Sequence, residues 1–296
     1  ISPATDGGYE DLDKNFSLNS RLFLAASFAS SRLRCSSSLA CAFAGCRELK
    51  TVNIPTGVVI GQSAFMGCDV LEESIYPTVS IGDLEFCLFH EDMTATVLKC
   101  SKEATNVIIP KEVTVGPAVF DVKSIGRFAF DTCEKLTSVA IPNSVTTIGQ
   151  CAFVRCTTLP SITIPDSVTS IGAAAFWWCT SLESIDIPDS ITTIEKMAFG
   201  VCTKLKSVTL PKDLKSIGFR SFTSSGLESI TIPESVKTIE GQAFHHCEKL
   251  DNICFAGTTE QWQQIALEDS WCNSNTPAKV VHCTDGDVEI IKTLTL

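Results

Sequence analysis

The sequence has no uninterrupted run of 18 apolar residues, so no segment has the length and character of a transmembrane helix. The apolar stretch from Leu22 to Ala29 is too short and too internal to act as a secretion signal, and the chain begins at Ile1 rather than at Met. We therefore expect no membrane insertion, and we expect the chain to be a fragment or a processed form.

Basic side chains are scarce relative to acidic ones. The chain has 23 Lys and Arg residues against 34 Asp and Glu residues, which gives a net charge of −11. Nucleic acids and anionic membranes are themselves negatively charged and attract basic surfaces. The composition therefore argues against either of them as the main partner.

Motifs of cofactor and metal sites are also missing. No C-x-x-C pair is present for zinc, and glycines that follow Ile never stand in a G-x-G-x-x-G or phosphate-loop context. The chain has four histidines, and the adjacent pair His245-His246 occupies a position that other parts of the chain fill with Trp or Val. We expect no enzyme activity, no cofactor and no metal site; an active site in residues 1–41 or 88–125 is the remaining enzymatic alternative.

What the sequence does have is a repeat of about 23 residues from Leu136 to Cys247. Ile-Pro or Leu-Pro pairs begin at positions 141, 164, 187, 210 and 232, and Ala-Phe or Ser-Phe pairs begin at 129, 152, 175, 198, 221 and 243. A cysteine follows the Phe by three residues at Cys133, Cys156, Cys179, Cys202 and Cys247. Such a period indicates a solenoid, in which each coil buries its apolar face by stacking on its neighbours.

One repeat shows how the residues predict a coil. A short strand ends at Pro142, which lacks the N–H that would extend it. A second short apolar stretch follows, and the A-F-x-x-C segment predicts a compact turn with one helical loop. Eight positions per coil are expected to point inward, namely Leu136, Val139, Ile141, Val145, Ile148, Ala152, Phe153 and Cys156.

Weaker copies extend the repeat toward the N-terminus. Ala42-Phe43 to Cys68 forms a shorter unit, and Leu71 to Phe86 looks like a worn one. The period breaks between His90 and Lys123, where residues 93–98 and 106–110 predict strands. We divide the chain into an N-terminal segment of unknown structure (1–41), degenerate repeats (42–90), an irregular repeat or insert (91–126), regular repeats (127–256) and a C-terminal cap (257–296).

These residues resemble the BspA-like leucine-rich-repeat family, whose unit runs approximately L-x-x-I-x-I-P-x-S-V-x-x-I-G-x-x-A-F-x-x-C. The resemblance covers roughly residues 42–296. It implies a right-handed superhelix of mainly short strands and a cell-surface or secreted protein that binds macromolecules of a host or neighbouring cell. The stretch from Ile253 to Gly286 resembles the module that caps many arrays of this family.

The cap is also expected on physical grounds. Thr258-x-x-Gln261 is a capping box that predicts a helix through about Leu267, with Trp262, Ile265 and Ala266 covering the last coil. Residues 280–283 and 288–291 flank Asp285-Gly286, which predicts a hairpin. Together they would cover the open end of the solenoid.

The cysteines are expected to be structural. We interpret the Cys column, defined as Cys133, Cys156, Cys179, Cys202 and Cys247, as buried thiols stacked coil on coil, with Cys46 and Cys68 in the same position of weaker units. The Cα–Cβ bonds of cysteines in neighbouring coils are expected to be parallel, which is an unfavourable geometry for a disulfide between them. A disulfide among Cys254, Cys272 and Cys283 is an open alternative, and the odd total of 15 cysteines leaves at least one thiol.

Two surfaces are candidates for binding. The Ser/Thr face consists of small polar residues that flank the inward residue of each first strand: Ser161, Thr163, Ser184, Asp186, Ser207 and Thr209. Such residues either suit a crowded strand surface or form a flat recognition surface. The second candidate is the Trp177-Trp178 pair beside Arg155, because Trp and Arg dominate interface hot spots.

We conclude from the sequence that the chain is a non-enzymatic adhesion or interaction protein. Its expected partner is a protein or an extracellular polymer, and its expected location is the cell surface or the extracellular medium. The alternative is an intracellular scaffold of the same fold, located in the cytoplasm. It is favoured by the many cysteines, which we interpret as reduced thiols.

Overall fold

The structure is a computed structural model that describes residues 78–272 and 275–290. The chain divides into two compact units, of which one comprises residues 1–77 and 89–92 and the other residues 78–88 and 93–296. Nearly all described residues belong to the second unit. The predictions for residues 1–41, for the unit from Ala42 to Cys68 and for Cys46 and Cys68 lie outside the described residues.

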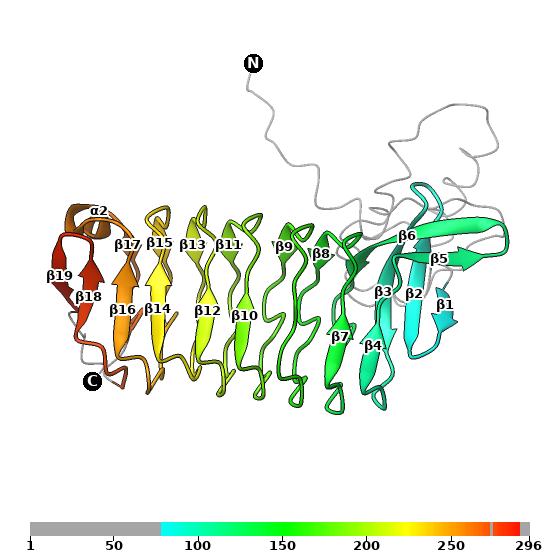
Figure 1. The fold of residues 1–296 in the computed structure, drawn as a ribbon, viewed down its shortest axis with the longest axis horizontal. Coiled ribbons are helices and arrows are strands. Elements are labelled where there is room, and N and C mark those ends of the chain that lie inside the picture. The colour runs from blue at the N-terminus through cyan, green and yellow to red at the C-terminus, as the bar shows by residue number, and fades with distance from the viewer. Residues whose placement is uncertain (1–77, 273–274, 291–296) are drawn as a thin grey trace, which may run out of the picture. The chain divides into compact units, whose positions relative to one another are not determined.

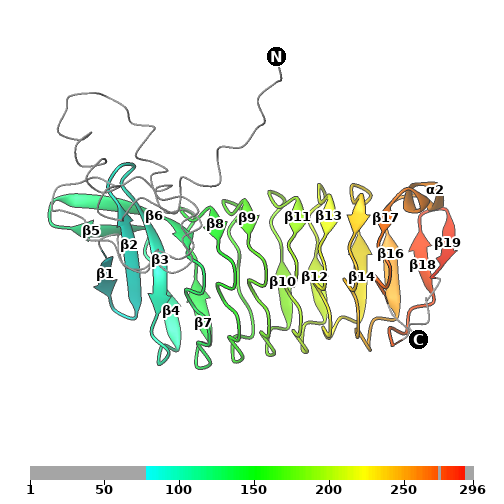
Figure 2. The ribbon, with the colours of Figure 1, turned by 180° about the vertical axis from the view of Figure 1, so that it is seen from behind.

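The second unit is a stack of coils whose strands form two parallel ladders (Figures 1 and 2). The first ladder begins with the strands that precede the prolines, β4 (Asn106–Ile108), β7 (Ser138–Ala140), β10 (Ser184–Asp186), β12 (Ser207–Thr209) and β14 (Ser229–Ile232), and continues with β16 (Asn252–Phe255) and β18 (Val280–Cys283). The coil between β7 and β10 joins this ladder through one parallel bridge, Ser161 to Ser184.

The second ladder contains the strands that, in the regular coils, end at the Ile before Gly or Glu. It consists of β3 (Thr94–Cys100), β6 (Ala118–Ile125), β8 (Thr147–Ile148), β9 (Ser170–Ile171), β11 (Thr193–Ile194), β13 (Ser216–Ile217), β15 (Thr238–Ile239) and β17 (Ala266–Leu267). Neighbours in register pair Ile with Ile, as in Ile194 with Ile217. This register places one apolar residue of each coil above the same residue of the previous coil.

The third side of each coil is the corner, defined here as the G-x-x-A-F-x-x-C segment. The N–H groups of Cys151, Phe153 and Arg155 donate to carbonyls of the next coil at 2.8 to 2.9 Å, while the alternate N–H groups bond within their own coil. Cys151 and Arg155 have φ values of 55° and 59°. The predicted helical loop is wrong, because turning alternate amides toward the next coil satisfies them there and leaves no i→i−4 pattern.

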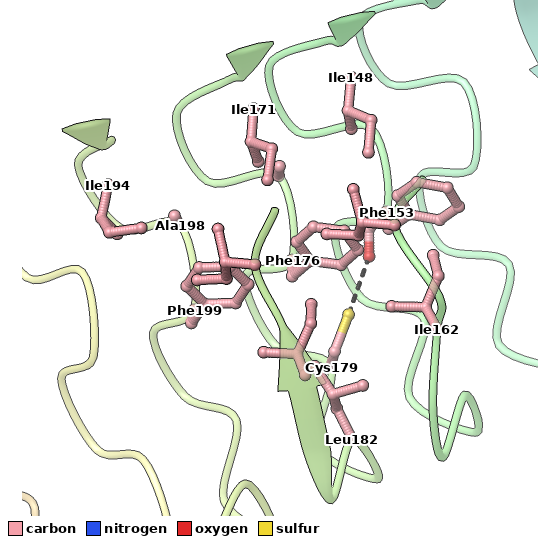
Figure 3. Close-up of a cluster of buried hydrophobic side chains, with 14 of the residues drawn as sticks. Ile148, Phe153, Ile162, Ile171, Phe176, Cys179, Leu182, Ile194, Ala198 and Phe199 are labelled. Atoms are coloured by element: carbon pink, nitrogen blue, oxygen red, sulfur yellow. Dashed lines mark hydrogen bonds between the residues drawn. The ribbon is translucent and has the colours of Figure 1, made fainter. Parts of the chain in front are cut away.

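Aromatic stacking fills the core behind the corner (Figure 3). Phe130, Phe153, Phe176, Phe199, Phe222 and Phe244 are fully buried. Neighbouring rings in this Phe column lie 4.8 to 5.5 Å apart between centroids and are within 17° of parallel. The predicted inward positions are confirmed, except that Ile141 is only partly buried.

The segment before the regular coils contains two antiparallel strand pairs. Residues 78–89 form an antiparallel hairpin of β1 (Thr78–Ile81) and β2 (Leu84–Phe89), and the worn repeat expected from Leu71 to Phe86 stays a prediction. Gly82 occupies the two-residue turn with φ of 59°, a conformation that glycine adopts without steric cost. The strands expected at 93–98 and 106–110 are confirmed as β3 and β4, and the excursion between them and the regular coils is the antiparallel pair of β5 (Glu112–Val115) with β6.

The C-terminal end has the predicted elements with different bounds. Helix α2 (Thr259–Gln263) begins with the expected capping box of Thr258 and Gln261. It ends before Leu267, because residues 266–267 form β17 and pair with β15. Trp262 and Ile265 are buried, but Ala266 is exposed, so its expected covering role is wrong. The hairpin is confirmed as β18 with β19 (Gly286–Glu289).

Ser221 stands where the other regular coils have alanine, and its hydroxyl is fully buried without a hydrogen-bond partner. We expect Ser221→Ala to raise the free energy of unfolding by about 1 to 3 kcal/mol, because it removes an unsatisfied polar group without leaving a large cavity. Chemical denaturation would measure the change. Ser225→Ala is the matched control: the Ser225 hydroxyl contacts the Cys247 thiol at 3.3 Å, so this variant should not gain stability, and a gain in both would contradict the explanation.

Candidate functional site

The six residues of the Ser/Thr face are all exposed, and all but Thr163 are paired in register with a neighbouring coil. Ser184 pairs with Ser207, and Asp186 pairs with Thr209. The Thr209 hydroxyl donates to a carboxylate oxygen of Asp186 at 2.7 Å. The structure therefore brings these predicted residues together on one surface, where each pair of coils adds another polar pair.

The same surface continues beyond the residues chosen from the sequence. Ser138 donates to the side-chain oxygen of Asn106 at 2.7 Å, which extends the serine row to the start of the first ladder. Ile108, in the outward row beside Ala140, is 80% exposed. The alternation in Asn-Val-Ile before Ile109-Pro110 carried this signal, because it places Val107 inward and Ile108 outward.

An acidic hollow of about 430 Å³ adjoins the Ser/Thr face. Its lining includes Asp166, Asp186 and Asp189, together with Ile187 and Pro188. The Asp189 carboxylate also pairs with the Lys212 ammonium at 3.3 Å. Across the described part of the chain, no three side chains of the metal-ligating types converge, so this hollow is reported as an acidic surface feature.

The Trp pair lies on the corner, as its sequence position requires. Trp177 is half-buried, Trp178 is 42% exposed, and the Arg155 guanidinium lies 5.5 Å above the Trp178 ring. A Cβ added at Gly200 would stand 2.1 Å from Cζ3 of Trp177. The Trp177 ring therefore covers Gly200 of the next coil, and only a residue without a side chain leaves room for it.

The adjacent histidines also lie on the corner and are accessible. His246 is exposed and its ring lies 3.1 Å from the side-chain amide of Asn275. His245 is half-buried, and burial together with the neighbouring His246 and Arg220 lowers the pKa of its imidazole. These contacts describe a solvated edge position, in line with the sequence interpretation.

The Cys column is fully buried, and its thiols are bound to the backbone. The thiol of Cys179 donates to the carbonyl of Phe153 at 3.2 Å (Figure 3), and Cys156 and Cys202 make the same bond to Phe130 and Phe176. Burial raises the pKa of the Cys202 thiol to about 12 and that of the Cys247 thiol to about 11. At neutral pH the Cys202 and Cys247 thiols stay protonated, and their burial gives them a packing role.

We expect Cys156, Cys179 and Cys202 to resist iodoacetamide until the protein unfolds, because only the thiolate reacts and burial disfavours it. Half-buried Cys254 is the internal reference and should be labelled in native buffer. Mass spectrometry of digested protein would locate the labels. Rapid native labelling of all three column cysteines would disprove their burial.

The cap cysteines do not form the disulfide that was left open. Cys254, Cys272 and Cys283 are thiols in the structure. Cys254 lies on β16 with its thiol 3.4 Å from the Asn252 side-chain oxygen, and burial raises the pKa of Cys283. The described part of the chain is therefore held by packing and hydrogen bonds without disulfides.

A family model described as the BspA type leucine-rich repeat region matches residues 30–113 and 123–251 in six copies, which is more than half of the chain. The chain belongs to this family. The match begins at residue 30, so the range inferred from the sequence, which began at residue 42, was too short at its N-terminal end. The match ends at residue 251, before the predicted cap. No curated protein matches the chain.

Solved structures of leucine-rich-repeat proteins are similar to the chain. The T. pallidum leucine-rich-repeat protein is 27% identical with a TM-score of 0.53, and the match covers 70% of this chain and 86% of that one. A leucine-rich-repeat protein from Eubacterium ventriosum is 22% identical with a TM-score of 0.57, covering 83% and 59%. A leucine-rich cell surface protein from Faecalibacterium prausnitzii is 32% identical with a TM-score of 0.49, and the chain spans 54% of its length.

The family supports a role in protein interaction, because the matching model describes a leucine-rich-repeat region. Among the described helices, none is long and apolar enough to cross a membrane. The repeat architecture gives such proteins long regular surfaces, on which binding residues repeat from coil to coil.

Proposed function

We propose that the chain is a non-enzymatic adhesion or interaction protein of the cell surface or the extracellular medium. It binds a protein or an extracellular polymer of a host or neighbouring cell through the Ser/Thr face. The observation that carries this proposal is the pair of exposed, in-register rows of small polar residues on the first ladder. Short side chains leave the surface flat, and repeated hydroxyls can meet an extended partner at many points.

The location is inferred from membership of the BspA type family, because resemblance to this family implies a surface or secreted protein. An intracellular scaffold of the same fold is the second candidate, and the observation that favours it is that the described cysteines are thiols. Counting thiols on protein from its native source separates the two. A cytosolic protein should show all 15 cysteines reduced, whereas oxidised cysteines would support the extracellular location.

The finer features of the fold also belong to this proposal. We take the coil to be a right-handed superhelix, and we take α2, β17 and the β18–β19 hairpin to be the cap that covers the last coil. Burial of Trp262 against Phe255 and Trp271, at 5.3 and 5.8 Å between ring centroids, supports the capping role. The boundaries at residues 41, 90, 126 and 256 stay predictions.

A pair of variants tests where the partner binds. Ser184→Arg combined with Thr209→Arg should abolish binding of a verified partner while leaving the fold intact, because both side chains are exposed and large charged groups block a flat contact. Circular dichroism would confirm the fold, and surface plasmon resonance would measure the affinity. If Trp178→Ala instead lowers the affinity by about 2 kcal/mol while the double variant binds normally, the corner is the site.

Normal binding by both variants would remove both surfaces from consideration. In that case the irregular segment at 91–125 would be the next candidate, because it contains the exposed Ile108 and the outward side chains of the β5–β6 hairpin.

A further inference from the structure

The arginines of the described residues gather on the corner. They are Arg127, Arg155 and Arg220, and each guanidinium lies over an aromatic ring: Phe128 at 4.9 Å, Trp178 at 5.5 Å and Phe219 at 5.1 Å. All three occupy the variable x-x pairs of the G-x-x-A-F-x-x-C segment, which the fold itself leaves free to change. Their common placement is therefore not a by-product of the repeat.

Arg155 and Arg220 differ from the paired lysines of this protein. Lys111, Lys123 and Lys212 each form an ion pair with a carboxylate. Among the described residues, Arg155 and Arg220 have no carboxylate partner; the Arg220 Nε–H donates to the Gln242 side-chain oxygen at 2.5 Å. A ring beneath a guanidinium orients it, and the N–H groups along its edge fit a carboxylate with two parallel bonds.

The two arginines lie on the same corner but in different x-x pairs, Arg155 in F-x-x-C and Arg220 in G-x-x-A. They lie three coils apart, and neighbouring coils repeat at 5.3 to 5.5 Å along the Phe column. Between them the Trp177 ring lies over Gly200, and the next corner residues are Val201, Thr223 and Ser224. On the F-x-x-C part of the corner no long side chain follows Trp178 as far as Ser224, whereas the G-x-x-A part carries Lys196 and Met197 in the coil before Arg220.

The local charge is opposite to that of the chain. Around these residues the corner positions carry Arg155, Lys196 and Arg220 against two carboxylates, Glu195 and Glu240, of which Glu240 accepts the Phe219 N–H at 2.7 Å. The whole chain has a net charge of −11, which repels a large acidic body. A short acidic segment can avoid this repulsion, since it meets only the local excess of positive charge.

We propose that this surface, the Arg–aromatic edge of Arg155, Trp177, Trp178, Gly200 and Arg220, binds a short acidic segment of a protein partner. Carboxylates of the segment bond to Arg155 and Arg220, and an apolar or aromatic side chain between them rests on the Trp177 ring. Trp and Arg are the residues in which protein interface hot spots are enriched. The proposal shares with the proposed function only the premise that the chain binds macromolecules, because the edge is separate from the Ser/Thr face.

A fluorescein-labelled peptide of five alternating Glu-Tyr units tests the proposal on the full chain, with fluorescence anisotropy as the measurement. The parent should bind this peptide more tightly than the matched peptide of five Gln-Tyr units. Arg155→Gln with Arg220→Gln should weaken binding at least ten-fold. The matched control, Lys206→Gln with Lys237→Gln, removes the same charge from exposed positions elsewhere and should stay within two-fold of the parent.

Gly200→Ala tests the aromatic floor without changing charge. The new Cβ displaces the Trp177 ring, so the peptide should bind at least three-fold more weakly, with unchanged far-ultraviolet circular dichroism confirming the fold. If this variant does not fold, Trp177→Ala replaces it.

Four outcomes would overturn the proposal: no preference for the acidic peptide, equal losses in the two double variants, binding of hyaluronate in place of the peptide, or edge-dependent binding to phosphatidylserine vesicles alone. The Ser184→Arg and Thr209→Arg variant should bind the peptide as the parent does. Failure of the edge and failure of the Ser/Thr face are therefore distinguishable.

Discussion

Replacing Phe176 with alanine is expected to lower the free energy of unfolding by about 3 to 5 kcal/mol. Its ring is fully buried and lies between Phe153 and Phe199, at 5.3 and 5.5 Å between centroids. The neighbouring coils cannot collapse into the space, because their backbones are fixed by hydrogen bonds between coils on three sides. The cavity therefore persists, and the free energy of unfolding falls by the full amount expected for an unfilled cavity.

Urea denaturation followed by circular dichroism would measure this loss. Phe128→Ala is the matched control, since Phe128 is 43% exposed and the same chemical change there should cost much less. Because Phe176 lies in the middle of the array, we also expect a broader transition, as the coils on either side unfold more independently. An unchanged midpoint for Phe176→Ala would show that the ring is not part of the core.

Much of the fold could be predicted from the sequence because the period acts on every coil at once. A residue such as Cys179 is one small apolar side chain, but its recurrence at a fixed distance from each Phe predicts that it stacks on Cys156 and is buried, as it is. The prolines mark the ends of the first strands for a covalent reason, the missing N–H. Because these signals are local and recur in every coil, a wrong prediction for one coil does not change the prediction for the others.

The corner could not be predicted in this way. Its alternate amides donate to the next coil, which requires positive φ at Cys151 and Arg155, residues that have no special preference for that conformation. Contacts between coils override the local propensity. A compact turn was the right prediction and a helical loop the wrong one, since sequence spacing alone does not say where the amides point.

The candidate sites show the same division. The exposure of Ser184 and Thr209 follows from alternation along a strand, so it was predictable. The placement of Arg220 over the Phe219 ring was not, because Arg220 occupies a different x-x pair from Arg155 and only the folded corner sets its guanidinium on a ring. The glycine at position 200 gave no sequence signal either, since its role depends on the ring that covers it.

Trp262→Ala should cost about 3 to 5 kcal/mol locally, with its effect confined to the C-terminal coils. Trp262 is 4% exposed and contacts Phe255 and Trp271 edge to face, and Trp271 in turn contacts Phe244, the last ring of the Phe column. Removing its indole uncovers the end of the core. In a solenoid each coil is stabilised mainly by its neighbours, so the loss should decline toward the middle of the array.

Hydrogen exchange measured by mass spectrometry would resolve this gradient. We expect faster exchange in β14, β16 and β18 and unchanged exchange in β7 and β8, whose pairing lies several coils away. Trp178→Ala is the control, because that ring lies on the exposed corner and does not cover the core. Uniformly faster exchange across all coils would contradict a local cap and would mean that the array unfolds as one cooperative unit.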